Sequence, residues 1–137
     1  MTCVFLNIIF VVMYIIWVLF VFTIYNGHSS SYLHYYISFL KKHRDISVVI
    51  HCLGGGLGLK QELLPKKKLL KLLTVNLICQ SEINNIVIKN FVQKKIRGKI
   101  IHVSGIAGLE SVASIGYSIA KAALIAYSKK LSKSFLK

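Results

Sequence analysis

Residues 98–124 read GKIIHVSGIAGLESVASIGYSIAKAAL, and this stretch decides the fold. It opens with a mostly apolar run, 99–104, which is typical of a strand in a parallel sheet. A loop with glycines follows. Residues 117–135 then place one face of a helix along Tyr117, Lys121, Leu124, Ser128, Leu131 and Phe135. The stretch therefore predicts a strand, a tight loop and a helix in succession.

A second strand and a second helix are predicted before this stretch. Residues 45–53 form a β-branched apolar run that ends at the glycine-rich residues 54–58. Residues 66–95 have helical periodicity, and Gly98 is expected to end that helix. Its apolar stripe comprises Leu69, Leu72, Leu73, Cys79, Ile83, Ile86 and Val87. The order strand, helix, strand, helix predicts an α/β fold with a parallel sheet, covered by helices on both faces.

The amino-terminal part of the chain has a different composition. Residues 1–40 contain no Asp, Glu, Lys or Arg, and residues 3–25 are long and apolar enough for a transmembrane helix, which needs about 20 residues. The first charges, Lys41, Lys42 and Arg44, would place the remainder in the cytoplasm. The alternative is that residues 1–25 are a misread gene start, because AT-rich DNA read in the wrong frame yields such residues. Residues 26–44 are interpreted as a linker and a short helix, and residues 45–137 as the domain.

Charge and cysteine content exclude several function classes. The net charge is +14, but the basic residues are mostly scattered lysines without interleaved aromatic residues, so we do not expect nucleic-acid binding. The three cysteines include no C-x-x-C pair, so neither a disulfide framework nor a metal site is expected.

Two features carry candidate chemistry. Tyr117 and Lys121 are four residues apart, so both project from one face of the predicted helix, where a lysine ammonium would stabilise a tyrosine phenolate. Asn76 is a polar residue within the apolar stripe. A buried amide needs hydrogen-bond partners, so Asn76 is either structural or part of a proton relay.

Residues 98–108 and 117–124 resemble the catalytic strand and the Tyr-x-x-x-Lys helix of the short-chain dehydrogenase/reductase family. Residues 45–55 occupy the place of the fourth strand of that family and its Asn-Asn-Ala-Gly turn, with His51 and Cys52 at the two Asn positions and Gly54 as the glycine. Asn76 lies where the family's catalytic helix carries Asn.

The resemblance implies a fragment of a Rossmann-like, doubly wound sheet and an oxidoreductase that moves hydride between NAD or NADP and a small carbonyl or alcohol. It implies that Tyr117 transfers the proton, that Lys121 holds the nicotinamide ribose, that Asn76 holds a relay water and that Gly54 contacts the cofactor. A serine would polarise the carbonyl. The strand motif places Gly105 at that position, whereas Ser104 has the usual spacing of 13 residues before Tyr117. Because a shift of one residue turns a strand side chain to the opposite face, Ser104 would need a local bulge to serve.

The resemblance covers only part of a whole enzyme. Nothing in residues 1–44 resembles the glycine-rich cofactor turn, and the chain stops inside the Tyr-Lys helix, so we expect an incomplete and inactive enzyme. The alternative is a membrane-anchored, non-catalytic module that acts by interaction, with helices that pair in a homo-oligomer. A two-stranded parallel sheet would have open edges and one uncovered face, which favours aggregation.

Overall fold

The structure is a computed structural model that describes residues 38–39, 42, 46–110 and 112–135. The chain divides into two compact units, Met1–Lys42 and His43–Lys137, and the account below concerns the second. The predicted transmembrane helix at residues 3–25 lies outside the described residues, as does most of the linker and short helix at 26–44. Among the residues that are described, no helix is both long and apolar enough to cross a bilayer.

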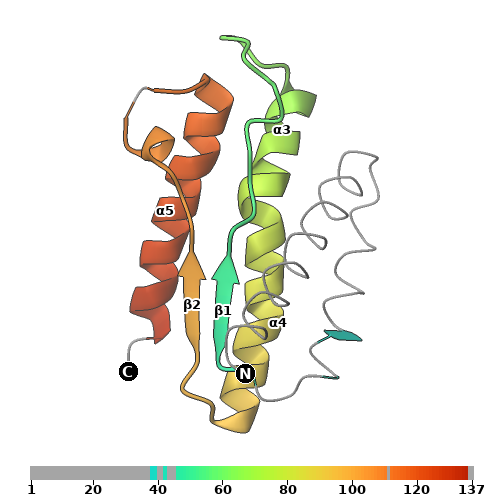
Figure 1. Ribbon diagram of the computed structural model, residues 1–137, viewed down its shortest axis with the longest axis vertical. Helices are drawn as coiled ribbons and strands as arrows, with labels where there is room; N and C mark the ends of the chain where they lie inside the picture. The colour runs from blue at the N-terminus through green and yellow to red at the C-terminus, as the bar shows by residue number, and fades with distance from the viewer. Residues whose placement is uncertain (1–37, 40–41, 43–45, 111, 136–137) are drawn as a thin grey trace, which may run out of the picture. The chain divides into compact units, whose positions relative to one another are not determined.

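The second unit has the predicted order of elements (Figure 1). Strand β1, Val48–His51, is followed by a continuous helical segment made of α3, Lys66–Leu73, the π-helical turn η1, Thr74–Ile78, and α4, Cys79–Lys94. Strand β2, Lys99–His102, leads through the short 3-10 helix η2, Ile106–Gly108, to α5, Ile115–Phe135. The two strands are parallel, and their register pairs Val48 with Lys99 and His51 with His102. The predicted parallel βαβ unit is therefore confirmed.

Among the described residues, helices cover one face of the two-stranded sheet, as expected for an incomplete sheet. Figure 1 shows α4 running along β1 and α5 along β2, with α3 beyond the carboxyl ends of the strands. On the other face the side chains are about half exposed, namely Val48 at 49%, Ile50 at 46%, Ile101 at 47% and Val103 at 47%. We call these four residues the open sheet face. Two strands bury one layer of side chains against the described helices, and no further described element covers the second layer.

The core lies between the sheet and the helices. Its fully buried residues from the long helical segment include Leu72, Val75, Cys79 and Ile83, and they pack with Ala120 and Leu124 of α5. Most of the predicted apolar stripe is therefore buried, but Leu69, Leu73 and Ile86 are only half-buried. The inward face follows Leu72, Val75, Cys79, Ile83 and Val87 instead.

The helical segment ends within one residue of the predicted bound at residue 95, but Lys95 rather than Gly98 provides the stop. Helix α4 ends at Lys94, and Lys95 takes the left-handed conformation with φ 55° while its N–H bonds to the carbonyls of Phe91 and Val92. Gly98 serves a different purpose, because a Cβ at this position would overlap the Phe91 ring. The glycine is needed for close packing of the chain as it enters β2.

Because the open sheet face is apolar and exposed, we expect the chain to self-associate. Charged substitutions on this face should reduce the association. Ile50 and Ile101 are cross-strand partners in the observed register. We expect the full-chain Ile50→Glu/Ile101→Lys variant to remain folded, because oppositely charged cross-strand pairs are tolerated, and to associate less. Light scattering at increasing concentration measures the effect. The control is Leu109→Lys/Val112→Glu, which makes the same exchange at two exposed residues outside the sheet, and equal association of the two variants would contradict the prediction.

Candidate active site

Tyr117 and Lys121 lie in the first turns of α5, on one face of the helix as predicted. The Lys121 Nζ atom is 5.6 Å from the centroid of the Tyr117 ring. Lys121 is 4% exposed, and its burial lowers the pKa of the ammonium group below the usual value. The helix thus holds a desolvated cation beside a half-buried tyrosine.

The loop after β1 meets this pair at Gly54. Gly54 has a φ of 136°, which favours glycine, and a Cβ here would overlap the Asn76 side chain and lie 2.9 Å from Lys121 Nζ. Only glycine lets the backbone pass between these two side chains. The structure therefore brings together three of the predicted site residues, Gly54, Asn76 and Lys121, at the carboxyl end of β1.

Asn76 uses its amide to hold the loop. Its Oδ1 accepts from the Gly55 N–H at 3.0 Å, while its Nδ2 donates to the Gly55 carbonyl at 3.0 Å and to the Leu72 carbonyl at 2.9 Å. Both amide hydrogens are therefore used, and only Oδ1 has a further lone pair to offer. Asn76 sits within the π-helical turn, where side chains compete with the backbone for helix carbonyls. The observed contacts make Asn76 a residue that positions the loop, and its relay role stays a prediction.

The side chain of Ser104 and a Cβ built at Gly105 would point in different directions. The Ser104 hydroxyl donates to the Lys121 carbonyl at 3.3 Å, so it is engaged by the backbone of α5. A Cβ at Gly105 would instead lie 4.0 Å from the Tyr117 hydroxyl oxygen. The structure does not bring the Ser104 hydroxyl to the Tyr117 hydroxyl. Position 105 faces the tyrosine, and in this chain it has no side chain.

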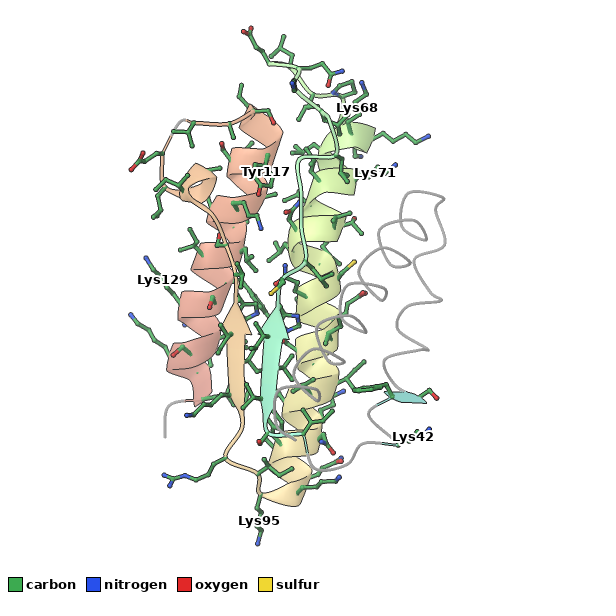
Figure 2. All side chains as sticks on the ribbon, viewed as in Figure 1. Lys42, Lys68, Lys71, Lys95, Tyr117 and Lys129 are labelled. Atoms are coloured by element: carbon green, nitrogen blue, oxygen red, sulfur yellow. The ribbon has the colours of Figure 1, made fainter. Side chains whose placement is uncertain are left out.

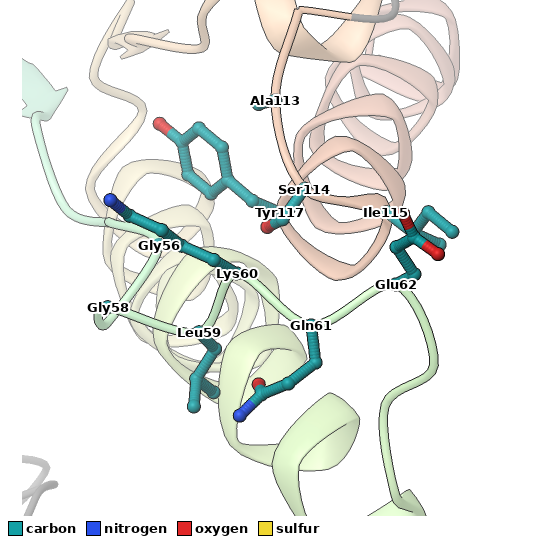
Figure 3. A pocket seen from close by; sticks show the side chains of 10 residues that line it. All are labelled: Gly56, Gly58, Leu59, Lys60, Gln61, Glu62, Ala113, Ser114, Ile115 and Tyr117. Carbon is teal, nitrogen blue, oxygen red and sulfur yellow. The ribbon is translucent and has the colours of Figure 1, made fainter.

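A cavity of about 690 Å³ opens beside Tyr117. Its walls come from the loop after β1 and from the start of α5, and they include Gly56, Lys60, Gln61 and Ser114. Figure 3 shows the Lys60 ammonium and the Tyr117 ring extending toward the same side of this cavity. The volume is within the range of small-molecule sites. We call this space the tyrosine cavity.

Two buried amides that continue the row begun by Asn76 were not predicted, and one of them, Gln80, supports the site. Asn76, Gln80 and Asn84 recur at intervals of four along the helical segment, and all three are fully buried. Gln80 Nε2 donates to the Leu53 carbonyl at 3.0 Å and to the Asn76 carbonyl at 2.9 Å, so it holds the strand end that carries the loop. The spacing of these three amides was visible in the sequence and would have indicated a polar row on one helix face.

Comparisons with known proteins agree with this geometry. The short chain dehydrogenase family matches residues 26–137. No curated protein is similar enough to count as a match. Among solved structures, 4-hydroxyisoleucine dehydrogenase in complex with NADH and succinate is similar at 23% identity with a TM-score of 0.66, covering 78% of this chain and 52% of that one.

Two other solved structures have the same fold. An oxidoreductase of the short chain dehydrogenase/reductase family from Burkholderia thailandensis is 22% identical with a TM-score of 0.66, covering 75% of this chain and 40% of that one. The bulky-bulky ketone specific alcohol dehydrogenase from Comamonas testosteroni is 18% identical with the same TM-score, covering 77% and 43%. The chain spans about half the length of the structures it matches or less. Since the family match extends over most of its length, the chain belongs to the short chain dehydrogenase family.

Proposed function

We propose that this chain carries the proton-transfer half of an NAD(P)-dependent oxidoreductase acting on a small carbonyl or alcohol. The observation that carries the proposal is the buried Lys121 ammonium, held beside the Tyr117 ring and against Gly54. A desolvated cation at this place favours a ligand that offers hydroxyl acceptors.

The residues present fit a nicotinamide cofactor. Lys121 has three N–H donors and is buried, and no carboxylate among the described residues forms an ion pair with it. Ribose hydroxyls would supply acceptors for those donors. Gly55 faces open space, because a Cβ at this position would meet no atom within 4 Å. When bound, the cofactor supplies or accepts the hydride.

The roles of the chain's own residues follow from their contacts. Tyr117 would give a proton to the substrate oxygen in reduction and take it back in oxidation. Lys121 would hold the ribose and stabilise the phenolate. Asn76 would keep the Gly54–Gly55 backbone in place, with Gln80 bracing the same loop through Leu53. The substrate would occupy the tyrosine cavity, whose size suits a small molecule.

The two substitutions Tyr117→Phe and Lys121→Met test the proposal in the full chain. We expect saturable NADH or NADPH binding, measured by cofactor fluorescence, to weaken strongly in Lys121→Met and to persist in Tyr117→Phe. Turnover of small ketones should fall in both variants, by about 10²–10⁴-fold for loss of the proton donor. The control is Lys129→Met, an exposed lysine two turns further along α5. If the wild-type chain shows no saturable cofactor binding, the proposal fails.

A second candidate function is favoured by the open sheet face. Three apolar side chains on the two strands and Val103 directly after β2 are about half exposed, and they form a surface that another polypeptide could cover. On this hypothesis the chain is a non-catalytic interaction module. The Ile50→Glu/Ile101→Lys variant separates the two, because it should abolish partner binding without altering cofactor binding at the carboxyl end of β1.

A further inference from the structure

A second cavity, of about 630 Å³, lies far from Tyr117 along the helices. It lies between the carboxyl-terminal halves of α4 and α5, beside the start of β2. The tyrosine cavity lies at the other end of the strands and shares no lining residue with it. We call this second space the distal cavity, and the proposed oxidoreductase function makes no use of it.

The walls of the distal cavity are largely apolar. They include Ile88 and Phe91 from α4, Ile100 from β2, and Leu131 and Phe135 from α5. Phe135 is 57% exposed at the mouth, while Phe91 is 8% exposed. An apolar ligand entering the cavity would therefore bury hydrophobic surface of its own together with that of these side chains, which favours binding.

Two cations line the cavity, and no acidic residue lines it. Lys95 and Arg97 come from the turn between α4 and β2. Figure 2 shows Lys95 extending from the end of α4. The helix dipole places about half a negative charge at such an end, but the N–H groups of Lys95 and Ile96 already bond to the last carbonyls of α4. The two exposed cations therefore favour an anionic group at this end of the cavity.

The interior end of the cavity has a hydroxyl donor. Asn84 Nδ2 donates to His102 Nε2 at 2.9 Å, so the neutral ring carries its proton on Nδ1. That nitrogen is 3.2 Å from Ser128 Oγ and donates to it. The Ser128 hydroxyl keeps its own proton for another acceptor. His102 and Ser128 both line the cavity, so they add a polar contact to an otherwise apolar wall.

From the apolar walls and the two cations, we propose that the distal cavity binds a medium-chain aliphatic carboxylate. The tail lies among Phe91, Ile100 and Leu131, and the carboxylate faces Lys95 and Arg97. Cations at a mouth and apolar walls behind it match the two ends of such a molecule, and the volume lies within the range of small-molecule sites.

The test uses the full chain held in solution by an amphipathic polymer, with an octanoate analogue that carries a diazirine near its methyl end. After irradiation, mass spectrometry locates the labelled residues. We expect labelling in the carboxyl-terminal halves of α4 and α5, suppressed by excess octanoate and weakened by added salt. The corresponding alcohol, with the same diazirine, should label the cavity less.

Two variants test the contacts separately. Lys95→Gln/Arg97→Gln should bind the probe about tenfold more weakly, because two cations are lost. The matched control, Lys129→Gln/Lys130→Gln, removes two exposed lysines of α5 that do not line the cavity and should leave binding nearly unchanged. Leu131→Trp should fill the cavity and abolish labelling. If Leu131→Trp does not fold, the comparison of the two double variants still tests the proposal.

Three results would overturn the proposal. Labelling concentrated on the open sheet face would show that the probe only finds exposed apolar surface. Equal affinity of the Lys95→Gln/Arg97→Gln variant and the Lys129→Gln/Lys130→Gln control for the probe would show that charge does not select the ligand. Suppose instead that labelling of α4 and α5 decreases as the protein concentration rises but does not decrease when octanoate is added. This result would show that a second copy of the chain covers the cavity.

Discussion

Replacing Gly105 by serine is expected to raise the turnover of a small ketone by about 100-fold, the contribution of one well-placed hydrogen-bond donor to a developing oxyanion. A Cβ at this position would lie 4.0 Å from the Tyr117 hydroxyl oxygen and meet no closer atom. The serine Oγ would therefore stand beside the tyrosine, where both hydroxyls could reach one substrate oxygen. The backbone is already suitable, because Gly105 has an extended conformation with φ −164° and ψ 162°, which any residue adopts.

The measurement is the rate of NADH and NADPH oxidation with a panel of small ketones. Gly105→Ala is the matched control, because it adds the same Cβ without a donor and should leave the rate at the wild-type level. Ser104→Ala should also have little effect on the rate, because the Ser104 hydroxyl is engaged by the Lys121 carbonyl. Equal rates for Gly105→Ser and Gly105→Ala would contradict the prediction. Loss of the gain in Gly105→Ser/Tyr117→Phe would show that the two hydroxyls act on one oxygen.

The difference between Ser104 and Gly105 illustrates what a sequence can predict. Side chains alternate across a strand, so the sequence already indicated that adjacent positions face opposite directions. A similar rule holds for a helix, where residues four apart lie on the same face, and it predicted that Tyr117 and Lys121 share one face. Both rules depend only on neighbours within one element. They were sufficient for the strands, the long helices and the tyrosine-lysine pair.

Contacts between different helices and strands could not be predicted from the sequence. The stacking of His51 on His102, with ring centroids 5.0 Å apart, depends on the register of β1 against β2, which a single sequence does not fix. The π-helical turn around Asn76, where the side-chain amide donates to the Leu72 carbonyl, was also missed. Both features are settled by tertiary contacts rather than by local propensity.

The buried histidine pair leads to the second large effect, a loss of stability in acid. His51 is 3% exposed, and its Nε2 donates to Asn84 Oδ1 at 2.7 Å. The groups that face it are Asn84 of α4 and the His102 ring of β2, and Tyr127 of α5 bonds to the same Asn84. Burial lowers the pKa of His51 to about 4, the Asn84 hydrogen bond partly opposes this, and the His102 ring adds to it.

The sign of the effect follows from the lowered pKa. The unfolded chain binds a proton at His51 near pH 6.5, whereas the folded chain does so only near pH 4. Between these values the unfolded state binds more protons, so the free energy of unfolding falls as the pH falls. The full contribution is present above about pH 6.5 and is lost toward pH 4, with a total of about 3 kcal/mol. Burial also lowers the pKa of His102, which adds in the same direction.

Urea unfolding of the full chain at a series of pH values measures this slope, and His51→Asn should flatten it. Asparagine can still bond to the Asn84 amide but does not titrate, so the variant removes the charge change and keeps a polar partner. His102→Asn is the comparison, and it should retain most of the slope because His102 is only half-buried. The chain has only four acidic residues, so carboxylates contribute little in this pH range. A slope that is the same with and without His51 would mean that the buried ring is not what makes the fold sensitive to acid.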